Sequence, residues 1–146
     1  MIVGDYVIHM NGLMSGFKYQ YQKPITTGLI HDISQWGCIT LSNQGNQFRS
    51  NEYLRISAID APDLTRITNL SGMFQGCKRL VNPDLSQWDT SKIQNMKQMF
   101  SGAVRFNGDL GAWNVDSVTD MSGMFYRAKA FNQDLIHWNT TAVQTM

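Results

Sequence analysis

The sequence is poor in charge, and it has no long apolar run. Charged residues make up 16% of the 146-residue chain, below the roughly 25% usual for soluble domains. Twelve Lys and Arg against eleven Asp and Glu give a formal net charge of +1, so the basic excess of a nucleic-acid binder is missing. No apolar run approaches the roughly 20 residues that span a bilayer. We therefore expect neither a nucleic-acid partner nor a membrane segment.

Signals for export and for metal binding are also missing. The first residues have neither the basic start nor the continuous apolar segment of a signal peptide. This predicts a cytoplasmic location if 146 residues are the full protein. The two cysteines, Cys38 and Cys77, belong to no CxxC or Cys/His cluster, so we expect free buried thiols rather than zinc ligands. No cofactor or metal is predicted.

Uncharged polar residues take the place of the missing charges, and the remaining pattern is periodic. The chain has 11 Asn, 11 Gln, 11 Ser and 10 Thr. Tryptophan recurs at intervals of 25 residues, with a leucine three residues before and a methionine eight residues after it: Trp88, Trp113 and Trp138; Leu85, Leu110 and Leu135; Met96, Met121 and Met146. Steps of 26 residues extend the pattern back to Pro62 and Trp36. We expect units that start near residues 32, 58, 84, 109 and 134, with the last unit truncated.

Each unit is predicted to run through a strand, a turn and a short helix. The apolar positions 93, 96, 99, 100 and 103 are spaced like one face of a helix. Ser91 with Gln94 has the spacing of a helix-capping box, and Gly76 and Gly102 fit helix ends. The segment from Asp84 to Trp88 and its equivalents then become short strands, with stacked leucines inside.

These units predict an α/β solenoid over residues 32–146, with a β-rich cap over residues 1–31. Asn107 and Asn132 should stack so that one amide satisfies the backbone of the next coil. No cap is visible at the other end, where Met146 stops within a predicted helix. We expect either a chain cut from a longer protein or self-association as a homo-oligomer through this apolar end.

Two stretches resemble a known family: DLSQWDTSKIQNMKQMFSGAVRFNGDLGAWNVDSVTDMSGMF and AFNQDLIHWNTTAVQTM. They are similar to the BspA-like bacterial surface-protein repeat, also known as the domain of unknown function DUF285, a distant relative of leucine-rich repeats. The resemblance covers roughly residues 30–146 and departs from the family pattern at Gln44, Gln47 and Pro62. It implies a right-handed superhelix like that of leucine-rich repeats, usually on exported or cell-surface proteins, and a role in adhesion or protein binding.

Nothing in the sequence assembles a catalytic site. The three histidines, His9, His31 and His137, pair with no nucleophile at a diagnostic spacing, so we predict no enzyme. A row of aspartates offers one carboxylate per unit, which favours turn residues over a calcium site: Asp84, Asp109 and Asp134. A methionine stripe is read as core rather than as a soft-metal or binding surface: Met73, Met96, Met99, Met121 and Met124.

The tryptophans are the candidate ligand-binding residues. If residues 85–88 alternate as a strict strand, Trp88, Trp113 and Trp138 point outward and form an aromatic strip. If the chain turns a corner after Ser86 or Gly111, the indoles are buried, and we favour this alternative.

The predicted function is a non-enzymatic protein-interaction or adhesion module, derived from or part of a bacterial surface protein, whose partner is another protein. One alternative is a structural spacer within a larger surface protein, which would have no specific ligand. The other is a glycan-binding module, which requires the outward tryptophan strip.

Overall fold

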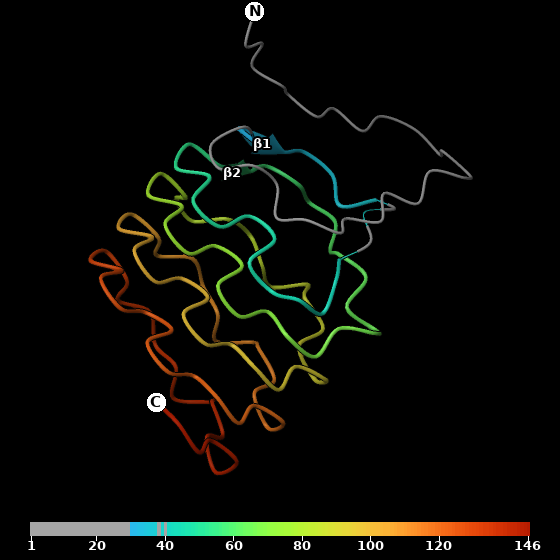
Figure 1. The fold of residues 1–146 in the computed structure, drawn as a ribbon, viewed down its shortest axis with the longest axis vertical. Coiled ribbons are helices and arrows are strands. Elements are labelled where there is room, and N and C mark those ends of the chain that lie inside the picture. Colours follow the sequence, from blue (N-terminus) through green and yellow to red (C-terminus); the bar gives the residue numbers. More distant parts are fainter. Residues whose placement is uncertain (1–29, 38, 40) are drawn as a thin grey trace, which may run out of the picture.

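The computed structural model describes residues 30–37, 39 and 41–146. The predicted cap over residues 1–31 lies outside this part, except for its last two residues. Two short strands, β1 (Asp32–Ile33) and β2 (Arg55–Ile56), pair in parallel, with Asp32 opposite Arg55 (Figure 1). In the part of the chain that the structure describes, there is no other strand of two or more residues and no helix. Accordingly, none of these residues belongs to a helix that could cross a membrane.

Beyond the strands, the chain runs in coils that lie side by side along the long axis, from green through yellow to red in Figure 1. Residues one coil apart are 25 or 26 positions apart in the sequence. Isolated parallel bridges join Asn69 to Asn95, Asn95 to Asp120, and Asp120 to Thr145. The coils are thus held together by backbone hydrogen bonds between residues far apart along the chain.

Within each coil, alternate amides bond locally and to the next coil. The Met73 amide donates to Leu70 O, three residues back, whereas the Phe74 amide donates to Met99 O in the next coil. The same alternation follows at the next two residues and recurs one coil later. Because every second amide is used between coils, the continuous i to i−4 ladder of an α-helix cannot form.

Two of these local bonds, from the Met73 amide to Leu70 O and from the Cys77 amide to Phe74 O, each close a four-residue turn whose third residue has a positive φ. These positions align from coil to coil in two columns: Asn46, Gly72, Gln98 and Gly123, and Ser50, Gly76, Gly102 and Arg127. A positive φ at the third position is the mark of a type II turn, in which glycine is favoured. Gly76 and Gly102 therefore sit within tandem turns and do not end helices.

The predicted α/β solenoid of strand, turn and helix units is therefore wrong. The predicted superhelix like that of leucine-rich repeats is wrong for the same reason. Residues 93–103 form turns rather than a helix, and residues 84–88 form no strand. The capping box is also wrong, because the Gln94 amide donates to Thr68 O and Ser91 is bonded to Asp89. Tandem four-residue turns bury their first and fourth residues, which gives the spacing i, i+3, i+4, i+7 of a helix face.

The core is built from columns of aromatic rings, one ring per coil. Successive phenylalanine rings, at residues 48, 74, 100 and 125, are stacked with centroids 5.9, 5.6 and 5.9 Å apart. Methionine and leucine fill the space beside them: Leu70, Met73, Leu85, Met96 and Met99 are fully buried. Each coil therefore buries its apolar side chains against its neighbours.

Candidate functional site

The tryptophan candidates lie in the core. Trp88 and Trp113 are only 4% and 3% exposed, and Trp138 in the last coil is partly buried. The Trp88 amide donates to Leu85 O across a turn, so the chain turns the corner that the buried alternative requires. The indole Nε1 of Trp113 donates to Leu85 O at 3.0 Å in the previous coil. Trp88 and Trp113 therefore offer no outward aromatic surface to a ligand.

The row of aspartates has the geometry of turn residues. Oδ1 of Asp84, Asp109 and Asp134 accepts a hydrogen bond from the amide two residues further along, at 3.0, 2.8 and 2.9 Å. In the part of the chain that the structure describes, no group of three His, Cys, Asp or Glu side chains could hold a metal ion. Each of these carboxylates thus already accepts a hydrogen bond from a backbone amide of its own turn.

Two other interpretations are confirmed. The five stripe methionines are at most 6% exposed and belong to the core. The Asn132 amide donates to Asn107 Oδ1 at 2.7 Å, so a side-chain amide does satisfy the backbone of the next coil. Cys77 carries a free buried thiol, while Cys38 is outside the described residues.

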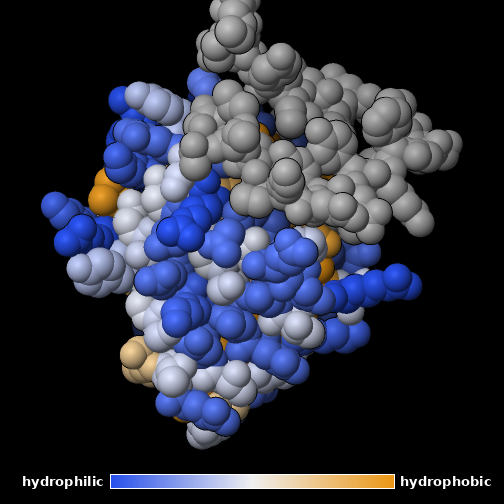
Figure 2. Space-filling model, in the orientation of Figure 1, coloured by the Kyte–Doolittle hydropathy of each residue, from blue (hydrophilic) through white to orange (hydrophobic). Residues whose placement is uncertain are grey.

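The structure brings together a different set of polar residues, in an open groove of about 780 Å³ near the two strands. We call it the arginine groove, and it is lined by His31, Asp32, Tyr53, Arg55, Ile56, Ser57, Arg79, Val81 and Arg105. The volume is within the range of ligand sites. The face drawn in Figure 2 is mostly hydrophilic, with a few separate hydrophobic spots.

The groove arises because equivalent positions of successive coils meet there. Tyr53, Arg79 and Arg105 follow one another at intervals of 26 residues and form one column. The Arg79 amide donates to Glu52 O at 2.9 Å, which places its coil directly beside that of Tyr53. The pairing of β1 with β2 adds His31 and Arg55, because the Arg55 amide donates to His31 O at 2.8 Å.

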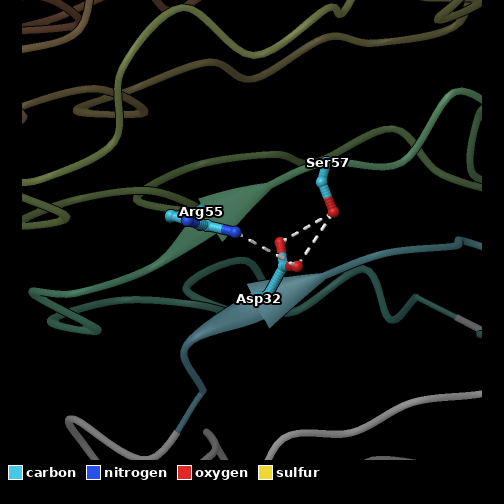
Figure 3. A network of polar contacts seen from close by, with 3 residues as sticks. All are labelled: Asp32, Arg55 and Ser57. Atoms are coloured by element: carbon cyan, nitrogen blue, oxygen red, sulfur yellow. Dashed lines mark hydrogen bonds and ion pairs between the residues drawn. The ribbon is translucent and has the colours of Figure 1, made fainter.

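The Asp32 carboxylate, which lines the groove, is held by two neighbouring side chains. The Ser57 hydroxyl donates to its two oxygens at 3.0 and 2.9 Å, and Arg55 Nη2 lies 3.8 Å from Oδ2 (Figure 3). The Asp32 side chain is 19% exposed, whereas that of Arg55 is 72% exposed. Asp32 is thus a positioned anion, and Arg55 remains accessible to a ligand.

Tyr53 contacts two other residues that line the groove, His31 and Arg79. Its ring lies 6.0 Å from that of His31, nearly parallel to it, and the Arg79 guanidinium carbon lies 4.7 Å from its centroid. This cation–π contact restricts the Arg79 side chain without consuming its hydrogen-bond donors. Tyr53 itself is 48% exposed, so both residues are ready to contact a ligand.

The groove contains the residue types of a Ser, His and Asp triad, but not its geometry. The Ser57 hydroxyl bonds directly to Asp32, so no imidazole lies between them. Within the described residues, no hydrogen bond joins His31 to Ser57 or to Asp32. A nucleophile activated by a general base is therefore not assembled here.

A family comparison identifies the chain. The model of a family described as Mycoplasma protein of unknown function, DUF285, matches residues 42–146. The chain belongs to the DUF285 family. The match spans most of the sequence and includes Tyr53, Arg79 and Arg105 of the groove. No curated protein and no solved structure matches this DUF285 chain.

Sequence reasoning missed the groove because it followed the tryptophans. The signal was present: Tyr53, Arg79 and Arg105 occupy one position of the 26-residue spacing, and two like charges follow each other there. Other stacked positions are uncharged, as in Asn43, Asn69 and Asn95, or carry the carboxylates of the turn aspartates, as in Asp84, Asp109 and Asp134. A column that places two arginines after a tyrosine was therefore a signal for a binding surface.

Proposed function

We propose that this DUF285 chain is a non-enzymatic protein-interaction module whose ligand surface is the arginine groove. The observation that carries this proposal is the Tyr53 and Arg79 pair, exposed and held together in an open groove. Tyrosine and arginine are enriched among the residues that dominate binding energies at protein interfaces. An ordered arginine also loses less conformational freedom on binding than a free one.

Two further observations support binding over catalysis. The groove has no assembled nucleophile and base, as described above, and its residues are spread over four successive coils. The resemblance of residues 84–125 to BspA-like surface repeats also favours an interaction or adhesion role. The glycan-binding alternative requires an outward strip of tryptophan rings, whereas Trp88 and Trp113 are buried.

Selection from a displayed library of random twelve-residue peptides tests the proposal. Immobilised full-length chain should select peptides, and these should bind the Tyr53→Ala variant at least tenfold more weakly, because the ring and the support of Arg79 are lost. Tyr126→Ala is the matched control: Tyr126 is 58% exposed and lies 5.1 Å from the Arg127 guanidinium, but outside the groove.

Two results would contradict the proposal. Peptides that bind the wild type and Tyr53→Ala equally well would place the ligand surface elsewhere. A library that yields no binder would favour the structural spacer, which has no specific ligand.

A further inference from the structure

The charges that line the arginine groove do not balance. Three arginines line it, Arg55, Arg79 and Arg105, with a single carboxylate among the lining residues, that of Asp32. This carboxylate already accepts the Ser57 hydroxyl and lies 3.8 Å from Arg55. No carboxylate of a described residue pairs with Arg79 or Arg105, because the two ion pairs there are Arg55–Asp32 and Lys78–Glu52. Two guanidinium groups are therefore available to an external anion.

The arrangement of these two arginines also favours an anion. They occupy the same position in adjacent coils, and coils joined by backbone hydrogen bonds lie about 4.8 Å apart. Like charges at this spacing repel each other. The neighbouring column instead carries opposite charges that pair with each other, since Lys78 Nζ lies 3.1 Å from Glu52 Oε2. In the Tyr53 column, an anionic ligand can supply the missing negative charge.

We infer that the arginine groove binds an acidic segment of a partner protein, with its carboxylates on Arg79 and Arg105. This inference rests on the proposed function, because it names the chemistry of the ligand in the same groove. Guanidinium groups bind carboxylates through paired, charge-assisted hydrogen bonds.

A peptide fits the groove better than a polyanion does. Val81, 48% exposed, and Ile56, partly buried, lie beside the arginines and offer contacts to an apolar side chain. Nucleic acids and sulfated glycans are held chiefly by extended positive charge, whereas this chain has a net charge of only +1. The ligand is therefore a short segment with two acidic residues next to an apolar one.

The peptide selection described above tests this inference through the composition of the peptides. Selected sequences should be enriched in Asp and Glu relative to the starting library, next to an apolar residue. Arg79→Gln and Arg105→Gln should each weaken binding of a selected peptide about tenfold, the loss expected for a charge-assisted hydrogen bond. Arg127→Gln is the matched control, because Arg127 also lies over a tyrosine ring but outside the groove. It should leave binding unchanged.

The possible failures are distinguishable. Peptides that need Tyr53 but show no acidic enrichment would overturn the acidic ligand and leave the proposed function in place. Peptides that bind equally to Tyr53→Ala would overturn both. A heparin octasaccharide serves as the polyanion probe: if it binds more tightly than the selected peptides and loses affinity in Arg79→Gln, the groove belongs to a sulfated glycan and the inference is overturned.

Discussion

Replacing Gly102 by alanine tests, through its effect on stability, whether this residue lies in the left-handed region that the tandem turns require. Gly102 has a φ of 72°, in the left-handed region. A Cβ atom built there would meet Gly76 Cα and N at 3.7 Å, an ordinary contact. Steric clash therefore contributes little, and the backbone conformation decides the result. Holding alanine in the left-handed region costs about 1–2 kcal/mol.

In a helix interior the same substitution would act in the opposite direction, because alanine is favoured there over glycine by about 1 kcal/mol. A helix end also favours a left-handed glycine, so the sign excludes a helix interior at this position. We expect Gly102→Ala to lower the free energy of unfolding by about 1–2 kcal/mol in urea denaturation. Lys97→Ala, at an exposed turn position without a positive φ, should stay within about 0.5 kcal/mol of the wild type. A Gly102→Ala variant as stable as the wild type or more stable would refute the turn geometry.

Three further predictions concern the core and the turns. Trp113→Phe should lower the free energy of unfolding by about 1–3 kcal/mol more than Trp88→Phe does. The reason is that Nε1 of Trp113 donates to Leu85 O, while Nε1 of Trp88 has no partner among the described residues. Equal losses in urea denaturation would contradict this. Burial raises the pKa of the Cys77 thiol to about 12, so in a Cys38→Ser background this thiol should react with Ellman's reagent at pH 8 only after unfolding. The free energy of unfolding should also decline as the pH rises from about 9 to 12. Rapid labelling of the native protein would argue against the buried thiol. Hydrogen bonds from the Ser86 and Ser91 hydroxyls, and then from the amides of the same residues, lower the pKa values of Asp84 and Asp89. The stability that these carboxylates contribute is therefore present above their unfolded pKa near 3.8 and is lost as the pH falls through their folded pKa values. Ser86→Ala with Ser91→Ala should reduce this acid sensitivity in thermal unfolding, and an unchanged pH profile would count against it.

The sequence allowed the buried side chains to be predicted, but not the backbone that buries them. Ile93, Met96, Met99, Phe100 and Ala103 are all fully buried, as their spacing predicts. Two successive four-residue turns and a helix place apolar residues at the same intervals, so the hydrophobic pattern does not discriminate between them. The burial of a residue and its secondary structure are separate conclusions.

A discriminating signal lay in the glycines. Gly72 lies in the middle of the predicted helix and Gly76 lies at its predicted end, four residues later, and both have positive φ values. Glycine at this period is unfavourable in a helix interior but fits the third position of successive type II turns. Gln98 and Arg127 occupy the same left-handed positions in other coils, and this obscures the period in the sequence.

The candidate site was less predictable than the core, because it depends on neighbours across coils. The 26-residue spacing places Tyr53, Arg79 and Arg105 in one column, which is visible in the sequence. Their position beside His31 and Asp32 also depends on the pairing of β1 with β2. No local pattern in residues 30–57 specifies that pairing, since each strand has only two residues.

Amide hydrogen exchange of the full chain, with and without a selected acidic peptide, tests the central claim most directly. If the arginine groove is the ligand surface, the peptide should slow exchange at residues 53–57, 79–81 and 105, and leave the turns around Tyr126 unchanged. Protection confined to the last coils, or no protection anywhere at saturating peptide, would contradict the account.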